Sequence, residues 1–128
     1  MKIGAQAEQF AIRYLQRQGL RFIAQNFQSR FGEIDVIMQD GDTLVFAEVR
    51  MRSSRTFGGA AASIDARKQR KLISTAQLYL ANLTRLPPCR FDAVLLQTPV
   101  NTRNRRNDEP NHIFLDAQVE WIKNAFSA

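Results

Sequence analysis

The sequence has little with which to cross-link itself or to hold a structural metal. Its 128 residues include a single cysteine, Cys89, and a single histidine. One cysteine excludes an internal disulfide, and the two residues together fall short of the roughly four nitrogen or sulfur ligands of a structural zinc site. No run of about 18 apolar residues is present, and the N-terminus lacks the pattern of a secretory signal peptide. We therefore expect a cytoplasmic protein without a membrane partner.

Positive charge is distributed unevenly along the chain. The 18 lysines and arginines exceed the 12 acidic residues by six. Residues 50–71 hold the whole excess, because seven basic residues there accompany one acidic residue, and the remaining chain has eleven of each sign. The seven are Arg50, Arg52, Arg55, Arg67, Lys68, Arg70 and Lys71. Clustered cations favour a polyanionic partner such as nucleic acid. The alternatives are a solvated helix face and a docking surface for an acidic protein.

Hydrophobic periodicity and turn residues predict an α/β fold. Apolar residues at helical spacing predict helices over residues 3–18 and 65–83, with Leu83 facing the core. The predicted strands cover residues 20–27, 33–39, 43–50 and 91–97, with a short edge strand at 112–115 and a brief terminal helix at 120–126. We expect one domain over residues 1–128, with mobile loops at about 51–63 and 99–111. Its mixed central sheet has four to five strands flanked by helices, in the order α-β-β-β-α-β.

A predicted hairpin brings two carboxylates together. If Gly41-Asp42 forms a two-residue turn, Asp35 falls opposite Glu48 on the same face of the sheet. Two opposed carboxylates repel each other unless a divalent cation or a shared proton compensates. Glu48 also lies among apolar residues, which is typical of a strand covered on both faces, where a carboxylate needs a partner. The spacing therefore suggests a divalent-cation site at these two acids.

Alternatives to this interpretation of the hairpin remain open. In the same register Glu33 falls opposite Arg50, so the acids of the hairpin could be ordinary polar-face residues. A three-residue turn would instead place Asp35 and Glu48 on opposite faces, because register decides the face of every side chain. The first helix adds Glu8 at the margin of its apolar stripe. From there Glu8 either reaches toward the sheet or pairs with a surface cation.

Two longer motifs resemble a known family. Residues 32–37 read Gly-Glu-Ile-Asp-Val-Ile, and residues 45–52 read Val-Phe-Ala-Glu-Val-Arg-Met-Arg. Together with Gly4 and Glu8 in the first helix, these motifs resemble the YraN-like uncharacterised bacterial proteins, over nearly the full chain. The resemblance implies a restriction-endonuclease-like fold, similar to that of archaeal Holliday-junction resolvases. It also implies a nuclease of the PD-(D/E)XK type.

The resemblance further implies roles for individual residues. In that superfamily an Asp on one strand and an (Asp/Glu)-x-Lys motif on the next bind Mg²⁺ or Mn²⁺. Asp35 matches the first acid, Glu48 the second, and Glu8 a glutamate of the first helix. The backbone carbonyl of Val49 is then a further metal ligand. Arg50 stands at the lysine position, where an arginine stays protonated but can still stabilise charge on a phosphate.

These observations predict a metal-dependent, structure-selective endonuclease that hydrolyses phosphodiester bonds of DNA, with branched or junction DNA as candidate substrates. The predicted catalytic residues are Glu8, Asp35, Glu48 and Arg50. The residues expected to hold flanking phosphates are Arg52, Arg55, Arg67, Lys68, Arg70 and Lys71. The alternative is a non-catalytic nucleic-acid-binding module on a nuclease scaffold, which the arginine at position 50 favours. Junction resolvases of this fold act as dimers, so a homodimer is a possible assembly.

Three polar residues outside this set have more than one interpretation. A glutamine on the following helix of some superfamily members corresponds to either Gln69 or Gln77. Asp92 begins a predicted buried strand, where it either faces the site or has a structural role, as a partner of Arg90 or a cap of a neighbouring residue. The sequence does not decide between these alternatives.

Overall fold

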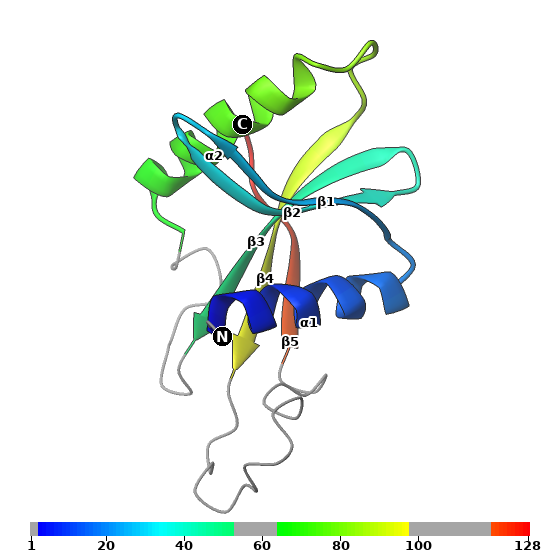
Figure 1. Ribbon diagram of the computed structural model, residues 1–128, viewed down its shortest axis with the longest axis vertical. Helices are drawn as coiled ribbons and strands as arrows, with labels where there is room; N and C mark the ends of the chain where they lie inside the picture. The colour runs from blue at the N-terminus through cyan, green and yellow to red at the C-terminus, as the bar shows by residue number, and fades with distance from the viewer. Residues whose placement is uncertain (1–2, 53–63, 98–118) are drawn as a thin grey trace, which may run out of the picture.

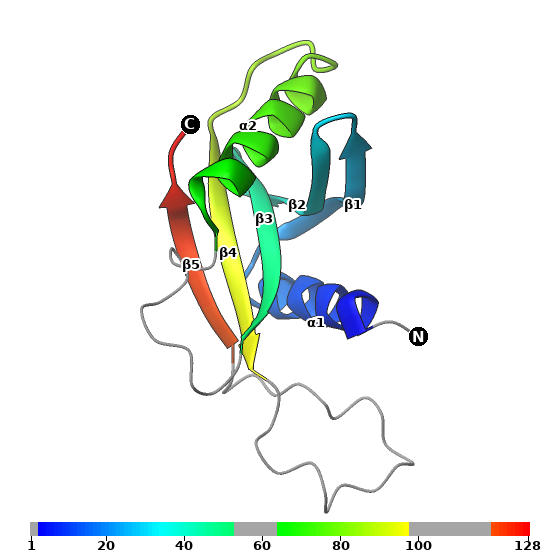
Figure 2. The same ribbon diagram turned by 90° about the vertical axis from the view of Figure 1, so that its left-hand side faces the viewer.

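One mixed sheet organises the part of the chain that the computed structural model describes, residues 3–52, 64–97 and 119–128. Its strands are β1 (Arg21–Ser29), β2 (Gly32–Asp40), β3 (Thr43–Arg52), β4 (Cys89–Gln97) and β5 (Val119–Phe126). The strands lie in sequence order across the sheet; β3 and β4 are parallel, and the other neighbours are antiparallel. The helices α1 (Ile3–Arg17) and α2 (Ala66–Leu80) cover opposite faces (Figures 1 and 2). This arrangement confirms the predicted α/β class and mixed sheet.

Local capping residues fix the ends of the helices. Helix α1 stops before Gly19, which has φ of 100°, and the Leu20 N–H returns to the Leu15 carbonyl at 3.1 Å. Helix α2 begins after Asp65, whose carboxylate accepts the Lys68 N–H at 2.8 Å. Each helix has 15 residues. No helix in the described ranges is long and apolar enough to cross a membrane.

Helix α2 is shorter than its sequence pattern predicts. Leu72 and Ala76 are buried as expected, but the helix ends at Leu80 and not at residue 83. The Asn82 N–H bonds back over only three residues, which tightens the last turn before the chain leaves toward β4. The prediction that Leu83 faces the core is therefore wrong, because this side chain lies beyond the helix and is 38% exposed.

The β2–β3 hairpin has the predicted register. A two-residue turn at residues 41–42 starts a ladder that runs from the pair Asp40↔Thr43 to the pair Val36↔Ala47. Gly41 supplies the positive φ, 62°, that such a turn needs. The three-residue turn that would separate the two acids is thereby excluded.

Strand β3 continues further than predicted. Met51 and Arg52 extend it beside Leu96 and Gln97 of β4, so the predicted loop at residues 51–63 starts two residues too early. The rest of that loop lies outside the described residues. The predicted loop at 99–111 and the edge strand at 112–115 lie outside them as well.

Strand β2 interrupts its alternation at Asp35. Val36 and Met38 pack under α1, and Ile37 packs under α2, as a regular strand requires. The sequence pattern groups Ile34 with Val36 and Met38, but Ile34 packs under α2 with Ile37. The grouping is wrong because the ladder with β3, which keeps the two strands in a common orientation, ends at Val36.

The C-terminal segment forms strand β5, and the predicted helix over residues 120–126 is wrong. Its apolar residues are spaced in a way that resembles a helix because the strand contains a bulge. Phe91 pairs with Phe126 and Ala93 with Ile122, so three residues of β5 lie opposite the single residue Asp92. Asn124, inside the bulge, has positive φ, and Ala125 packs in the same cluster as Ile122 and Phe126. Trp121 and Phe126 still pack against the core, as expected of this segment.

Candidate functional site

Strands β2 and β3 separate just beyond the last pair of their ladder, Val36↔Ala47. From there β2 remains paired with β1, and β3 continues beside β4 to its end (Figure 1). Asp35 and Glu48 are the next residues on the two strands. The Val49 N–H donates to Asp35 Oδ2 at 2.8 Å, so a side chain accepts the bond that a continued ladder would take. Both acids therefore sit where the sheet divides.

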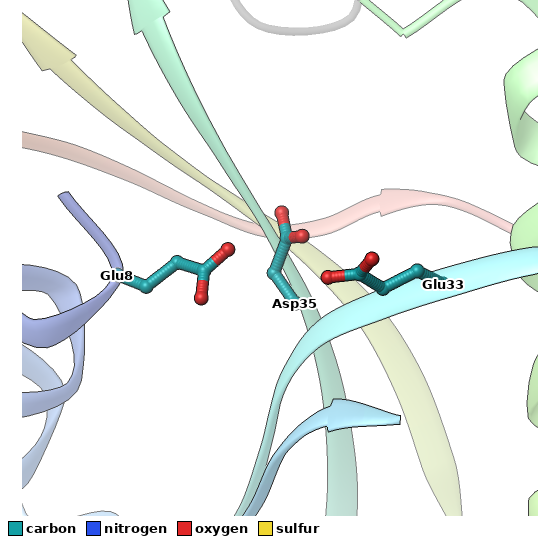
Figure 3. A group of neighbouring side chains, drawn as sticks. All are labelled: Glu8, Glu33 and Asp35. Carbon is teal, nitrogen blue, oxygen red and sulfur yellow. The ribbon is translucent and has the colours of Figure 1, made fainter. Parts of the chain in front are cut away.

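Three carboxylates meet beside this point. Glu8 reaches over from α1, while Glu33 and Asp35 project from β2, and an oxygen of each lies within 4.8 Å of the other two (Figure 3). Sequence reasoning places Glu33 opposite Arg50 and omits it from the site. The ladder ends before that pair forms, which leaves Glu33 beside the other two acids. The spacing of Glu33 and Asp35, two residues apart on one strand, is the signal that could have identified it.

Amide side chains of β1 hold Glu8. The Gln25 side chain donates to Glu8 Oε1 at 3.5 Å and accepts from the Gln9 amide at 3.3 Å. Asn26 also hydrogen bonds to Glu8. Its φ of 57° is a left-handed conformation that asparagine tolerates better than most residues. Burial, and then the negative charge of Asp35, raise the pKa of Glu8 above its ordinary value. In the described structure Glu8 thus faces the sheet, as one of its two predicted alternatives requires.

Glu48 is buried beside Asp35, with only 5% of its surface exposed. Its Oε2 lies 3.2 Å from Arg50 Nε and 3.5 Å from Lys68 Nζ. Burial, followed by the charge of Asp35, raises the pKa of Glu48 to about 7. Burial also raises the pKa of Asp35. A proton on Glu48 would be shared with the Asp35 carboxylate, as expected for two acids in one site.

The charges of this site fit a divalent cation. Four carboxylates, those of Glu8, Glu33, Asp35 and Glu48, are accompanied by the two cations that contact Glu48. When all four acids are ionised, two negative charges remain uncompensated. Among the described residues, Glu48 Oε1 is a buried oxygen without a hydrogen-bond donor. Oxygen ligands and residual negative charge are what Mg²⁺ and Mn²⁺ prefer. The metal roles of Glu8, Asp35, Glu48 and the Val49 carbonyl remain predictions.

Comparison with known proteins places this chain among relatives. The uncharacterised protein family UPF0102 matches residues 7–96. The chain belongs to the UPF0102 family. A UPF0102 protein of Nitrosomonas europaea is 52% identical over 96% of this chain and 92% of the relative. One of Methylobacillus flagellatus is 50% identical over 99% and 98%, and one of Pseudomonas syringae pv. syringae is 45% identical over 98% and 93%. The YraN-like resemblance is thereby confirmed.

The basic residues of this UPF0102 chain do not share one environment. Arg67, Arg70 and Lys71 are exposed on the first turns of α2. Lys68 is half-buried and contacts Glu48, although sequence reasoning groups it with the others. The Arg52 side chain and Arg55 lie outside what the structure describes.

The two candidate glutamines lie on different parts of α2. Gln69, in the first turn, donates to the Ile64 carbonyl at 2.8 Å and so anchors the start of the helix. Gln77 lies near the other end and is exposed. It lines an apolar groove of about 440 Å³, together with Leu80, Leu86 and other apolar side chains. Gln69 is therefore the candidate at the N-terminal end of α2, where Lys68 contacts Glu48.

Asp92 pairs with residues that lie outside the carboxylate site. It is fully buried and accepts both Arg90 Nε, at 3.0 and 3.2 Å, and Trp121 Nε1, at 3.0 Å. The Asn124 N–H, inside the β5 bulge, donates to the same carboxylate at 2.9 Å. Of the two interpretations of Asp92, the structure shows the pairing with Arg90.

The buried Glu48 predicts an unusual dependence of stability on pH. Because its pKa is raised from 4.5 to about 7, the folded state binds this proton more tightly than the unfolded state. The stability linked to that proton is present below about pH 4.5 and is lost as pH rises through 7. At pH 8 the free energy of unfolding of Glu48→Gln should therefore exceed that of the wild type by about 1–3 kcal/mol. At pH 5 the two proteins should unfold at the same urea concentration.

Urea unfolding in EDTA at the two pH values tests this expectation. Asp42→Asn, which removes a carboxylate from the exposed hairpin turn, is the matched control and should show no such pH-dependent gain. If Glu48→Gln is equally destabilised at both pH values, burial does not penalise the ionised Glu48.

Proposed function

We propose that this protein is a divalent-cation-dependent endonuclease of the PD-(D/E)XK type that hydrolyses phosphodiester bonds in DNA. The observation that carries the proposal is the position of Asp35. It lies between the acids Glu8 and Glu33 (Figure 3), and it also interacts with Glu48, which two cations contact. Acids that can hold a metal, next to cations that can face a phosphate, suit phosphodiester hydrolysis.

Each group of residues has a role in this proposal. Glu8, Glu33, Asp35 and Glu48 would hold Mg²⁺ or Mn²⁺ with the Val49 carbonyl. When bound, such an ion supplies Lewis-acid polarisation of the phosphate and acidifies water. Arg50 neutralises the charge that develops on the phosphate.

The exposed cations of α2 support binding to DNA without sequence preference. Arg67, Arg70 and Lys71 can contact flanking phosphates, which position a nucleic acid but carry no sequence information. The proposed substrates are therefore defined by structure, with branched and junction DNA as the first to test.

Cleavage of end-labelled DNA tests the proposal. Linear, flapped and four-way substrates are incubated with Mg²⁺, Mn²⁺ or EDTA. We expect cleavage in either metal, none in EDTA, and none by the double variant Asp35→Ala/Glu48→Ala. Cleavage that persists in EDTA, or in the double variant, would contradict the proposal.

The second candidate is a nucleic-acid-binding module without catalysis. Arg50 favours it, since an arginine in the lysine position stays protonated and cannot accept a proton from water. Binding of the same DNA substrates with no cleavage in Mg²⁺ or Mn²⁺ would support this candidate and overturn the first.

A further inference from the structure

The start of α2 carries charges that its own backbone disfavours. A helix N-terminus has a partial positive charge, so acidic residues stabilise the first turn and basic residues destabilise it. The first turn of α2 contains no acid, but it contains Arg67 and Lys68. Departures from such local rules are expected at functional sites.

Lys68 is held differently from the other cations of this helix. Asp65 caps its backbone N–H at 2.8 Å, and the next residue, Gln69, is tied to the carbonyl of the buried Ile64. Arg67 and Lys71 are exposed, whereas only 35% of the Lys68 side chain is exposed. The helix start is therefore fixed in a position that aims Lys68 at the carboxylates.

Two cations converge on one carboxylate oxygen at the site. Arg50 Nε and Lys68 Nζ lie 3.2 and 3.5 Å from the same Glu48 Oε2. Arg50 Nε is buried and makes no hydrogen bond among the described residues, so its contact is electrostatic and poorly aligned. Lys68 therefore shares its carboxylate oxygen with a second cation, Arg50. An ammonium group on a flexible chain can rotate its three donors to a neighbouring anion, which a planar guanidinium does less freely.

We propose that Lys68 is a catalytic residue whose ammonium group binds the scissile phosphate beside Asp35 and Glu48. This assignment rests on the proposed function and deepens it. Lys68 is thereby distinguished from Arg67, Arg70 and Lys71, which hold flanking phosphates. Its pairing with Glu48 places the ammonium at the acids before DNA binds. Helix α2 then supplies a lysine to a site in which strand β3 has an arginine, Arg50, at the position of the expected lysine.

A comparison of Lys68→Gln with Lys71→Gln tests this assignment. Both variants remove one positive charge from the same helix, three residues apart. We expect Lys68→Gln to lower kcat by about 10²-fold or more with little change in KM. We expect Lys71→Gln to raise KM a few-fold and leave kcat nearly intact. It should also reduce the salt dependence of DNA binding in EDTA by about one phosphate contact.

Mn²⁺ affinity, measured by calorimetry, supplies a readout besides activity. Lys68→Gln should bind Mn²⁺ at least as tightly as wild type, because a neighbouring positive charge has been removed. Its thermal unfolding should stay close to that of Lys71→Gln. If both variants affect kcat and KM alike, or if Lys68→Gln loses Mn²⁺, the assignment fails while the nuclease function stands. If the wild type cuts no DNA in either metal, the proposed function fails and the assignment fails with it.

Discussion

Asp35→Asn should reduce metal-dependent cleavage on the order of 10³-fold or more, the largest loss of any single substitution in this protein. Asp35 alone joins the two halves of the site, since it lies beside Glu8 and Glu33 and also beside Glu48. Asparagine keeps an oxygen that can accept the Val49 N–H, so the fold is retained. It loses the negative charge on which metal binding depends.

Two measurements on Asp35→Asn separate chemistry from folding. Mn²⁺ titration should show weakened binding, and urea unfolding in EDTA should show stability at least equal to wild type. The variant loses a half-buried carboxylate whose pKa is raised by burial. Asp42→Asn, in the exposed turn of the same hairpin, is the matched control and should cleave as wild type does. Wild-type Mn²⁺ affinity in Asp35→Asn would rule out the proposed metal site.

Asp92→Ala should destabilise the protein by about 3–5 kcal/mol, the cost of breaking a buried ion pair by removing one partner. Its carboxylate is fully buried and accepts hydrogen bonds from Arg90, Trp121 and the Asn124 backbone. Alanine leaves Arg90 Nε, Trp121 Nε1 and the Asn124 N–H without this acceptor, although Arg90 keeps its contact with Asp40. It also releases the bulge that sets the register between β4 and β5.

Asp40→Ala is the matched control for this prediction. Asp40 pairs with the same Arg90, at 2.9 Å, but its side chain is 34% exposed. Its loss should cost at most about 1 kcal/mol. Urea unfolding of both variants checks the difference. Equal losses would show that Asp92 does not organise the β4–β5 pairing.

The hairpin that carries the site could be predicted from sequence because a local signal determines it. Gly41-Asp42 fixes the turn, and the turn fixes which residue of β3 lies beside each residue of β2. With the two-residue turn that the structure shows, that arithmetic places Asp35 next to Glu48. The burial of Glu48 follows from its apolar neighbours on β3.

Glu33 and Lys68 could not be assigned from the same arithmetic. Continuing the ladder in the same register pairs Glu33 with Arg50, but the strands separate first. No local sequence pattern marks the point at which the ladder ends. Lys68 lies among several basic residues of similar sequence context, and its contact with Glu48 in the folded structure distinguishes it from them.

In the terminal strand β5, a bulge accompanies a sequence pattern that is typical of a helix. Trp121 packs in the cluster under α1, whereas Ile122, Ala125 and Phe126 pack in the cluster under α2, and these four positions together have a spacing that suggests a helix. The buried Asp92, on a different strand, is what accommodates the bulge. The pattern within residues 119–126 alone therefore favours the wrong element.

The parallel pairing of β3 with β4 affects how the chain folds during synthesis. Strands β1 to β3 can pair once residue 52 has left the ribosome, but one edge of β3 stays unpaired until Gln97 is made. At about 5–20 residues per second this interval lasts about 2–9 s. The exposed edge includes Val45, Phe46 and Ala47, an apolar segment of the kind that pairs with other chains. Aggregation of the nascent protein is therefore most favoured in this interval, after the four acids have been synthesised and before β4 supports them.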